Sequence, residues 1–378
     1  MNSAKGLLGL AVLSVGATAV ADQPQYTIVD LGVVNSTDSA SQGFRISASG
    51  IATGRSFGTG KTQAYTWTQG GGLSGLSNLA SPVRNYCVGN GVNDSGTVVG
   101  VGATTSFGSS RLPVMWENGV ATQLGLPSGQ TLGDANDVNN NKVAVGSANS
   151  GTNQRAVIYQ SGTGSFITAT TSNGSYFVTA FGVNDSGLVV GEGWDPNNAA
   201  ITVGLVYDMS TGTTSSLGSL TSFGHNSAIA FDVSNAGYVV GSSSLNGGAN
   251  SLPFVWTAGG GMSAIALPTG TSQGSARGVN DSGWVVGTAS SAFAIPFLYD
   301  GTNTYRLADL LVNSNGWDLL TNTSSSAMGI SDSGVIVGTG VHNGATHAYA
   351  MVPVPEPASF AVLGLGALAL ISRKRKNQ

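Results

Sequence analysis

A ten-residue segment recurs along this chain and limits its fold more than any other feature. Its clearest copy is 182–191, in which Asn-Asp-Ser-Gly leads into Leu-Val-Val-Gly. Six further copies of varying quality complete the set, with closing glycines at positions 54, 100, 146, 191, 241, 287 and 338. The steps between these glycines are 46, 46, 45, 50, 46 and 51 residues. A regular period of this size predicts a repeat architecture with one supersecondary unit per period.

Each period contains signals for four short strands. In the copy at 182–191, the apolar stretch Tyr176–Val183 precedes the turn Asp185-Ser186-Gly187, and Leu188–Gly191 is the returning strand. Asp and Ser can hydrogen-bond their own backbone and Gly accepts a positive φ, so we expect a tight hairpin. A third strand at 203–207 and a fourth at 215–218 follow. Four antiparallel strands in about 40–50 residues match one propeller blade.

The sequence therefore predicts an all-β chain, a β-propeller of about seven four-stranded blades over residues 22–352. Helical solenoids do not fit, because 57 of 378 residues are glycine and each glycine inside a helix costs about 1 kcal/mol. Tyr26–Gly32 resembles the fourth strand of a repeat but precedes the first hairpin, whereas the last repeat stops after His347–Val352. We expect the N-terminal strand to close the last blade, which leaves no open sheet edge.

The N-terminal segment 1–21 has the features of a Sec signal peptide. Lys5 precedes an apolar run at 6–20, and Ala19 and Ala21 form a small-residue cleavage signature. Export through the Sec translocon is the expectation, and a first core helix is the alternative.

Three parts follow one another in the C-terminal segment 353–378. They are the motif Pro355-Glu356-Pro357, an apolar run at 358–372 and the basic cluster Arg373-Lys374-Arg375-Lys376. A transmembrane helix over the 15 residues of the run would be about 22 Å long, shorter than a hydrocarbon core of about 30 Å.

This order resembles the PEP-CTERM sorting signal. The resemblance implies recognition by an exosortase-type processing enzyme in a Gram-negative bacterium and an inner-membrane precursor that is inserted transiently. It also implies removal of the tail near the motif and delivery to the cell surface or the extracellular matrix. A permanent single-span anchor is the alternative.

The repeats resemble the HAF family of extracellular repeats, whose name comes from a His-Ala-Phe start to the third strand. His347-Ala348-Tyr349 is the nearest copy, and the Asn-Asp-Ser-Gly hairpin is kept. The His and the Leu-Gly-x-Leu end of the family pattern are changed in most copies. The resemblance covers most of residues 26–352, and it implies no catalytic activity.

Charge and cysteine content exclude several classes of partner and site. Without the two terminal segments, nine of the 14 Lys and Arg remain against 17 or 18 Asp and Glu, so a nucleic-acid partner is not expected. The single Cys87 excludes a disulfide framework and a cysteine zinc cluster.

No metal site and no cofactor are predicted. The hairpin aspartates at positions 94, 185, 281 and 332 suggest calcium as an alternative, but Ca²⁺ takes six to eight oxygens and each hairpin offers one carboxylate. We interpret them as turn formers. The three histidines, His225, His342 and His347, are interpreted as scattered, without a partner at ligand spacing.

The tryptophans divide into two groups. Trp67, Trp116 and Trp256 share one repeat position and are expected to pack between blades. Trp194 and Trp317 lie in polar connections and are candidate glycan contacts, because an exposed indole can stack on the apolar face of a sugar. Local packing is the alternative for both.

These features together predict a secreted, exosortase-sorted surface or matrix protein with a non-catalytic binding or structural role, associated with exopolysaccharide. No catalytic residue is assigned, because no nucleophile motif selects one serine. The alternative is a hydrolase or lyase that acts on extracellular polysaccharide. That alternative requires a pair of carboxylates or a histidine cluster at one mouth of the ring.

Overall fold

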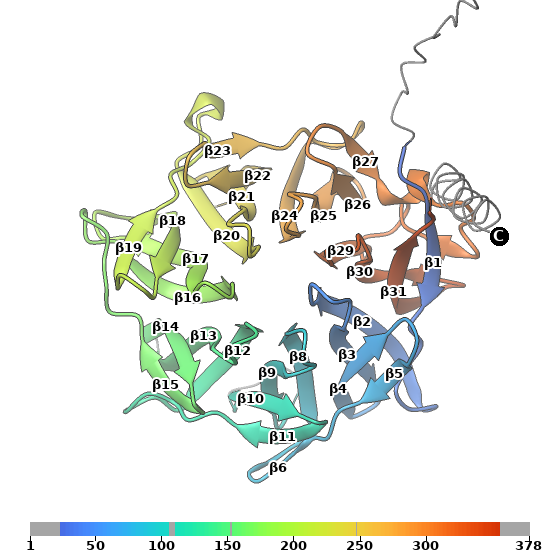
Figure 1. Ribbon diagram of the computed structural model, residues 1–378, viewed down its shortest axis with the longest axis horizontal. Helices are drawn as coiled ribbons and strands as arrows, with labels where there is room; N and C mark the ends of the chain where they lie inside the picture. Colours follow the sequence, from blue (N-terminus) through green and yellow to red (C-terminus); the bar gives the residue numbers. More distant parts are fainter. Residues whose placement is uncertain (1–22, 106–109, 152, 247, 356–378) are drawn as a thin grey trace, which may run out of the picture.

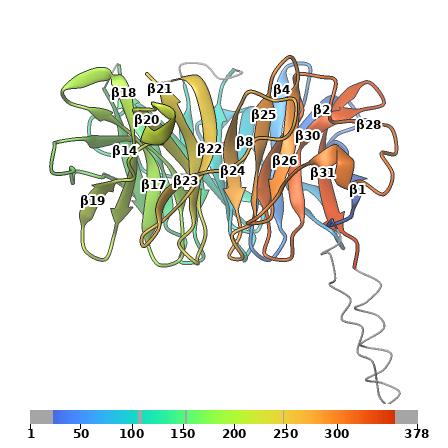
Figure 2. The same cartoon turned by 90° about the horizontal axis from the view of Figure 1, so that it is seen from above.

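The computed structural model describes residues 23–105, 110–151, 153–246 and 248–355. In Figure 1 these residues form a ring of β-sheets around a central axis. Each unit of the ring has four antiparallel strands, and we call such a unit a blade. Seen from the side in Figure 2, the strands run between the two ends of a disc. The expected all-β class is confirmed.

The described residues form seven blades, numbered along the chain. Blades 1 to 4 contain, in order, β2 (Asp38–Ile46), β3 (Ala52–Gly58), β4 (Lys61–Thr68) and β5 (Gly72–Gly75); β8 (Tyr86–Val92), β9 (Val98–Ala103), β10 (Leu112–Glu117) and β11 (Val120–Gln123); β12 (Leu132–Val138), β13 (Ala144–Ser150), β14 (Asn153–Gln160) and β15 (Thr163–Phe166); β16 (Tyr176–Val183), β17 (Leu188–Asp195), β18 (Asn198–Asp208) and β19 (Thr213–Ser216). Blades 5 to 7 contain β20 (Ser227–Val233), β21 (Val239–Leu245), β22 (Ala249–Thr257) and β23 (Gly261–Ala264); β24 (Gln273–Val279), β25 (Val285–Ser290), β26 (Ala294–Tyr299) and β27 (Thr304–Arg306); β29 (Ser326–Ile330), β30 (Ile336–His342), β31 (Ala345–Pro353) and β1 (Tyr26–Asp30).

Short elements lie in the connections between blades. They are β6 (Leu79–Ala80), β7 (Val83–Arg84), β28 (Trp317–Asp318) and the 3₁₀ helices η1 (Thr221–Phe223) and η2 (Leu307–Leu310). Blades 1 and 2 are joined into one sheet by a single parallel bridge between Thr62 and Tyr86.

Blade 7 is built from both ends of the described chain, as the sequence predicted. β1 pairs antiparallel with β31, from Tyr26 opposite Pro353 to Asp30 opposite Tyr349. The inner strand β29 of this blade contacts β2 of blade 1, so the ring is continuous. The prediction that the N-terminal strand supplies the strand missing from the last repeat is confirmed.

The two ends of the disc carry different connections, and we call them the hairpin end and the loop end. At the hairpin end, the first and second strands of every blade are joined by the recurring turn, which reads Asn-Asp-Ser-Gly in blades 2, 4 and 6 and is varied in the others. β31 finishes at this end, beside the start of β1. At the loop end, the second strand joins the third and the chain passes from one blade to the next.

The closing glycine of each repeat faces an irregularity in the first strand. In blade 3, the register between β12 and β13 shifts between Ala135 and Asp137, and Gly146 lies opposite this bulge. A Cβ atom on Gly146 would meet the carbonyl oxygen of Asp134 at less than 3.0 Å, and all seven closing glycines have an equivalent contact. The backbones approach too closely for any side chain, and this explains why glycine recurs at this position.

The apolar core lies between neighbouring blades. One cluster joins Ala64 and Leu76 of blade 1 with Cys87, Val114 and Trp116 of blade 2. Trp67 and Trp116 are buried at 4% and 0% exposure, and Trp256 packs against the cluster between blades 4 and 5. Their expected place between blades is confirmed.

Several predicted segments lie outside the described residues. These are the signal peptide 1–21 with Ala19 and Ala21, the apolar run 358–372, and the residues Glu356, Pro357, Arg373, Lys374, Arg375 and Lys376. Within the residues that the structure describes, no helix has the length and apolar character needed to cross a membrane.

Candidate functional site

The asparagine that opens the hairpin motif holds its own turn and the next blade together. Oδ1 of Asn93 accepts the backbone N–H groups of Ser95 at 3.1 Å and Thr97 at 2.9 Å. Its Nδ2 donates to the carbonyl oxygen of Asn139 at 3.0 Å. The same tie from Nδ2 to the next blade is made by Asn139, Asn184 and Asn280. Blades 1, 5 and 7 have serine here, and the shorter hydroxyl accepts an N–H of its own turn.

The next residue of the motif bonds to the neighbouring blade. Oδ1 of Asp185 accepts the backbone N–H of Asn140 at 2.7 Å, and Oδ1 of Asn140 accepts that of Asp94 at 3.0 Å. In four equivalent bonds a backbone N–H donates to a side-chain Oδ1 of the next blade. The donor and acceptor residues are Ser49 and Asp94, Asp185 and Asn235, Ala236 and Asp281, and Asp281 and Asp332. The N–H of Asp332 donates to the carbonyl oxygen of Ala48 at 3.2 Å and completes a circle.

This circle corrects one prediction. The sequence predicted that the hairpin aspartates bond their own backbone, and this is wrong because the preceding asparagine or serine already takes that role. Each aspartate instead meets the N–H of the adjacent turn, since the seven hairpins crowd around the axis. Amide groups separate two of the carboxylates: Nδ2 of Asn140 donates at 2.9 Å to both Asp94 and Asp185. Burial raises the pKa of Asp94, but its bonds from Asn140 and Ser49 outweigh this and lower it.

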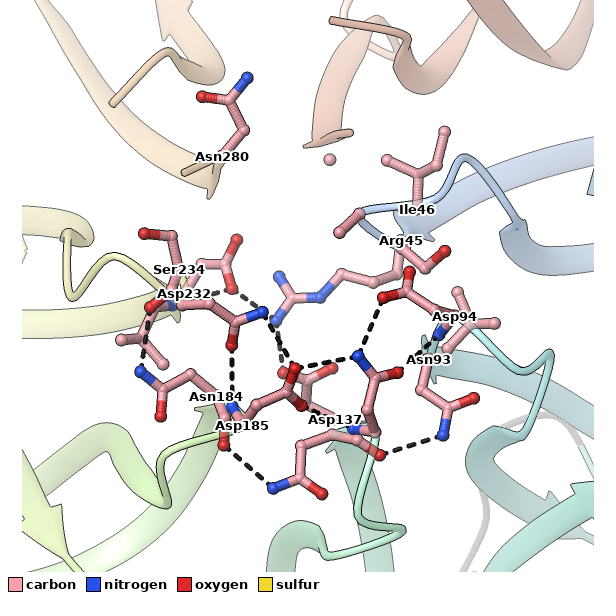
Figure 3. A pocket seen from close by; sticks show the side chains of 18 of the residues that line it. Arg45, Ile46, Asn93, Asp94, Asp137, Asn184, Asp185, Asp232, Ser234 and Asn280 are labelled. Carbon is pink, nitrogen blue, oxygen red and sulfur yellow. Dashed lines mark hydrogen bonds and ion pairs between the residues drawn. The ribbon is translucent and has the colours of Figure 1, made fainter. Parts of the chain in front are cut away.

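An ion triad lies on the axis just inside this circle (Figure 3). Arg45 at the end of β2 places Nη2 2.8 Å from a carboxylate oxygen of Asp137 on β12 and 2.8 Å from one of Asp232 on β20. The two aspartates also accept backbone N–H groups of the following blades, from Val183 and Val279, each at 3.0 Å. The ion pairs thus link blades 1, 3 and 5 across the axis. The backbone hydrogen bonds of the two aspartates add blades 4 and 6.

Burial and the neighbouring charges shift the pKa of Arg45 and of Asp232. Burial opposes the charge on Arg45, but the two carboxylates outweigh it, so the pKa of the guanidinium is raised above its usual value. Burial raises the pKa of Asp232 to about 6; Arg45 offsets part of this rise and Asp137 adds to it. Between the triad and the hairpin circle lies a polar pocket of about 100 Å³.

The other side of the triad has a different character. Each bulge in the first strands turns one extra side chain toward the axis, and these seven side chains line a cavity of about 230 Å³ at the loop-end side: Phe44, Asn90, Asn136, Phe181, Phe231, Arg277 and Met328. The guanidinium of Arg277 lies 4.0 Å from the ring centroid of Phe231, and Phe231 lies 5.5 Å from Phe181. Within the described residues, Arg277 has no carboxylate at ion-pair distance.

A second cavity of about 290 Å³ continues from this one between blades 1, 2 and 3. It shares Phe44, Asn90 and Asn136 and adds Arg55, Val88, Val101, Arg111 and Asp134. Burial lowers the pKa of Arg55 and of Arg277, so an anion beside either would be favoured. Burial also raises the pKa of Asp134, although Arg111 at 3.4 Å pulls it down.

The two candidate glycan contacts occupy different environments. Trp194 near the end of β17 is 47% exposed at the loop end, as a sugar platform requires. Trp317 is 7% exposed and stacks on His342 with ring centroids 4.7 Å apart. It packs locally, which was the other interpretation of this residue, and it is too buried for the expected glycan contact. Trp317 is buried because β28, to which it belongs, pairs with the end of β30 and places Trp317 opposite His342.

The interpretation of the histidines as scattered is also wrong for two of them. His342 and His347 meet at Asp30, while His225 is buried elsewhere, beside Phe223. Strand pairing in blade 7 causes this meeting, because Gly340 and His347 are direct partners and Asp30 lies opposite Tyr349.

The sequence reasoning missed the axial triad, although the repeat contained a signal. Two residues before the opening Asn or Ser, the seven copies have Arg45, Gly91, Asp137, Gly182, Asp232, Gly278 and Gly329. One arginine and two aspartates at a position that is otherwise glycine indicated an ion pair between blades. A Cβ atom on Gly91 would meet the Cα of Asp137 at 2.5 Å, so glycine lets the backbones of neighbouring blades approach each other closely near the axis.

Comparison with known proteins identifies a sorting motif in the C-terminal segment and relates the fold to solved structures. Residues 353–376 match the family model of the PEP-CTERM protein-sorting motif, which indicates exosortase-dependent export and sorting to the surface. The motif thus begins at the hairpin end, where Pro353 and Pro355 are the described part of it. No curated protein matches this chain. The resemblance to HAF repeats rests on the sequence alone and stays a prediction.

Among solved structures, the chain resembles a streptogramin B lyase with a TM-score of 0.51 and 11% identity, over 87% of this chain and 98% of that chain. It also resembles a putative TolB from Agrobacterium tumefaciens, with a TM-score of 0.43 and 13% identity over 88% and 100% of the two chains. A gluconolactonase from Xanthomonas campestris has a TM-score of 0.40 and 11% identity over 88% and 91%. Identity this low shows the fold alone, and the first of these likenesses indicates a β-propeller-like architecture.

Proposed function

We propose that this protein is a non-catalytic binding protein of the cell surface or extracellular matrix that holds an acidic polysaccharide at the loop end of its ring. The observation that carries the proposal is the cavity lined by the bulged residues, where Arg277 lies against Phe231 and faces no carboxylate among the described residues. Toward the hairpin end, the pocket lined by the described residues is smaller, about 100 Å³, and the turns around it bond to one another.

The chain as a whole is acidic, but arginines line the two loop-end cavities, and their side chains suit a sugar that bears carboxylates. Phe44, Phe181 and Phe231 present aromatic faces, which stack on the apolar faces of sugar rings. Arg55 and Arg277 carry guanidinium groups, whose planar fork matches a carboxylate. The exposed Trp194 at the same end adds a stacking surface outside the cavity.

The position of the sorting motif favours the same end. Val354 donates its N–H to the carbonyl oxygen of Gln25 at 2.8 Å, so both described termini lie at the hairpin end. While a tail held in the inner membrane retains the precursor, the hairpin end faces the bilayer and the loop end faces away. An exosortase-type enzyme cuts near Pro355 and releases the HAF-like ring to the surface or matrix; a permanent anchor is the alternative outcome.

Binding of polygalacturonate and of neutral dextran to the full-length chain in mild detergent tests this proposal. We expect polygalacturonate to bind and dextran not to bind, and the Arg277→Gln and Phe181→Ala variants each to weaken binding at least tenfold. Lys142→Asn is the matched control, because it removes a cation from the hairpin end. Equal affinity of all variants, or equal binding of both polymers, would contradict the proposed site.

A second candidate function is supported by Asp134. Its carboxyl lines the second cavity, and burial raises its pKa, as expected for a general acid. A hydrolase or lyase would then act on the same acidic polymer. New reducing ends or an unsaturated product, lost in Asp134→Asn but kept in Lys142→Asn, would establish catalysis; an intact polymer after prolonged incubation supports binding alone.

A further inference from the structure

Three potential metal ligands of blade 7 converge at the loop end of the ring. Asp30 ends β1, His342 ends β30, and His347 lies near the start of β31. The Nδ1 atoms of His342 and His347 lie 3.0 and 2.8 Å from Oδ2 of Asp30. All three ligand atoms lie within 4.8 Å of one another.

Each of two side chains is held in place by a second set of contacts. Oδ1 of Asp30 accepts the N–H of Gly32 at 2.8 Å. The ring of His342 stacks on Trp317 with an interplanar angle of 10°. Its Nε2 lies 3.1 Å from the side-chain Nδ2 of Asn343 and 3.1 Å from the carbonyl oxygen of Asn315. A metal-bound imidazole usually donates its second ring N–H to a group of this kind. Asp30 and His342 are therefore held in place before any ion arrives, and His347 is held by its hydrogen bond to Asp30.

We propose that Asp30, His342 and His347 bind a Zn²⁺ ion. Two imidazole nitrogens and a carboxylate oxygen are ligands that Zn²⁺ accepts at about 2.1 Å, and tetrahedral geometry places such atoms about 3.4 Å apart. The observed separations of 3.0 and 2.8 Å need to widen by only about 0.5 Å to reach this spacing. The side chains are 21 to 28% exposed, so an ion can enter and the fourth position is open to water or a ligand.

The ion would connect the N-terminal strand to the C-terminal strands that together close the ring. Asp30 and His342 are 312 residues apart in the chain and belong to the strands that close blade 7. An ion bound by the folded chain alone stabilises the folded state by mass action. Zn²⁺ would thus lock the N-terminal strand against β30 and β31, in addition to their backbone pairing.

Without an ion, the two imidazoles can each donate an Nδ1 proton to Asp30. A cluster held only by such protons would show no Zn²⁺ binding. A titration with Zn²⁺ therefore distinguishes a metal site from a cluster held by hydrogen bonds alone.

The test uses the full-length chain in mild detergent, freed of metal by a chelator and titrated with Zn²⁺ alone. We expect one ion per chain with a Kd in the micromolar range or below, and a Tm that rises by roughly 3–6 °C when Zn²⁺ exceeds its Kd a hundredfold. Co²⁺ in the same site should give the visible absorption bands of nitrogen and oxygen ligation.

Two variants and one control decide the assignment. Asp30→Asn and His347→Gln should lose at least a hundredfold in Zn²⁺ affinity, together with the Tm rise and the Co²⁺ bands. Asp208→Asn is the control, because it removes an exposed carboxylate from a hairpin of blade 4 whose backbone bond an amide can keep. Unchanged Zn²⁺ affinity in both variants, or binding no tighter than millimolar in the parent chain, would overturn the proposal.

Discussion

The two ends of the ring use the same repeat in opposite ways. At the hairpin end, seven turns of similar sequence are tied into a circle, and their polar groups bond to one another. At the loop end, the bulged position changes from blade to blade, as Phe, Asn, Asn, Phe, Phe, Arg and Met in chain order. The repeated positions therefore make the contacts that hold the ring together, and the divergent positions line the cavity where we propose that a ligand binds.

The largest expected effect tests the axial triad against the loop-end arginine. Arg45→Ala leaves Asp137 and Asp232 buried without their cation, and we expect it to lower the free energy of unfolding by about 3–5 kcal/mol. Arg277→Gln removes one cation–π contact and should cost less than about 1 kcal/mol. Urea unfolding followed by tryptophan fluorescence measures both. Equal losses in the two variants would mean that the ends do not differ as described.

The second effect is the pH dependence of the same triad. Since burial raises the pKa of Asp232 to about 6, the folded chain binds a proton there that the unfolded chain releases near pH 4. The stability that this carboxyl contributes is complete below about pH 4 and is lost as pH rises to about 6. Asp232→Asn lacks this carboxyl, so the Tm of the parent chain minus the Tm of the variant should fall as pH rises from about 4 to about 6. A difference in Tm that rises over this pH range would contradict the raised pKa.

A smaller effect tests the hydrogen-bonded circle. Asp185 accepts three N–H donors from Asn140 and Asn235, and we expect Asp185→Ala to cost about 1–2 kcal/mol in the free energy of unfolding. Asp195→Ala at the loop end removes one exposed bond within its own turn and should cost about 0.5 kcal/mol. Chemical denaturation of the two variants side by side gives the comparison, and a larger loss in Asp195→Ala would reverse it.

The smallest effect belongs to the bulged position itself. Met328→Asn installs the residue that blades 2 and 3 already have there, so we expect a change below about 0.5 kcal/mol. Gly338→Ala, in the same blade, places a Cβ against the carbonyl oxygen of Ser326 and should cost more than about 1 kcal/mol. Thermal melts of both variants would decide whether the loop end tolerates change while the repeat does not.

Much of the fold could be predicted because its signals are local. The turn around Asp185 and the flanking strands follow from side chains that act within a few residues, and β16 and β17 have the expected bounds at the turn. The pairing of β1 with β31 followed from counting strands per repeat. The candidate sites could not be predicted in the same way, since Trp194 alone among the expected glycan contacts has the expected exposure.

The sequence by itself determined the number of repeats, the four-strand unit and the position of the sorting motif, because periodicity, turn chemistry and a terminal motif are written along the chain. The tertiary structure alone decided which side chains meet. Arg45 reaches Asp137 across 92 residues and Asp30 reaches His347 across 317, because the closed ring brings equivalent positions of distant blades to one axis and both ends of the chain into one blade. Strand propensity and turn chemistry act over a few residues and do not bring these side chains together. The contacts exist only once the ring has closed.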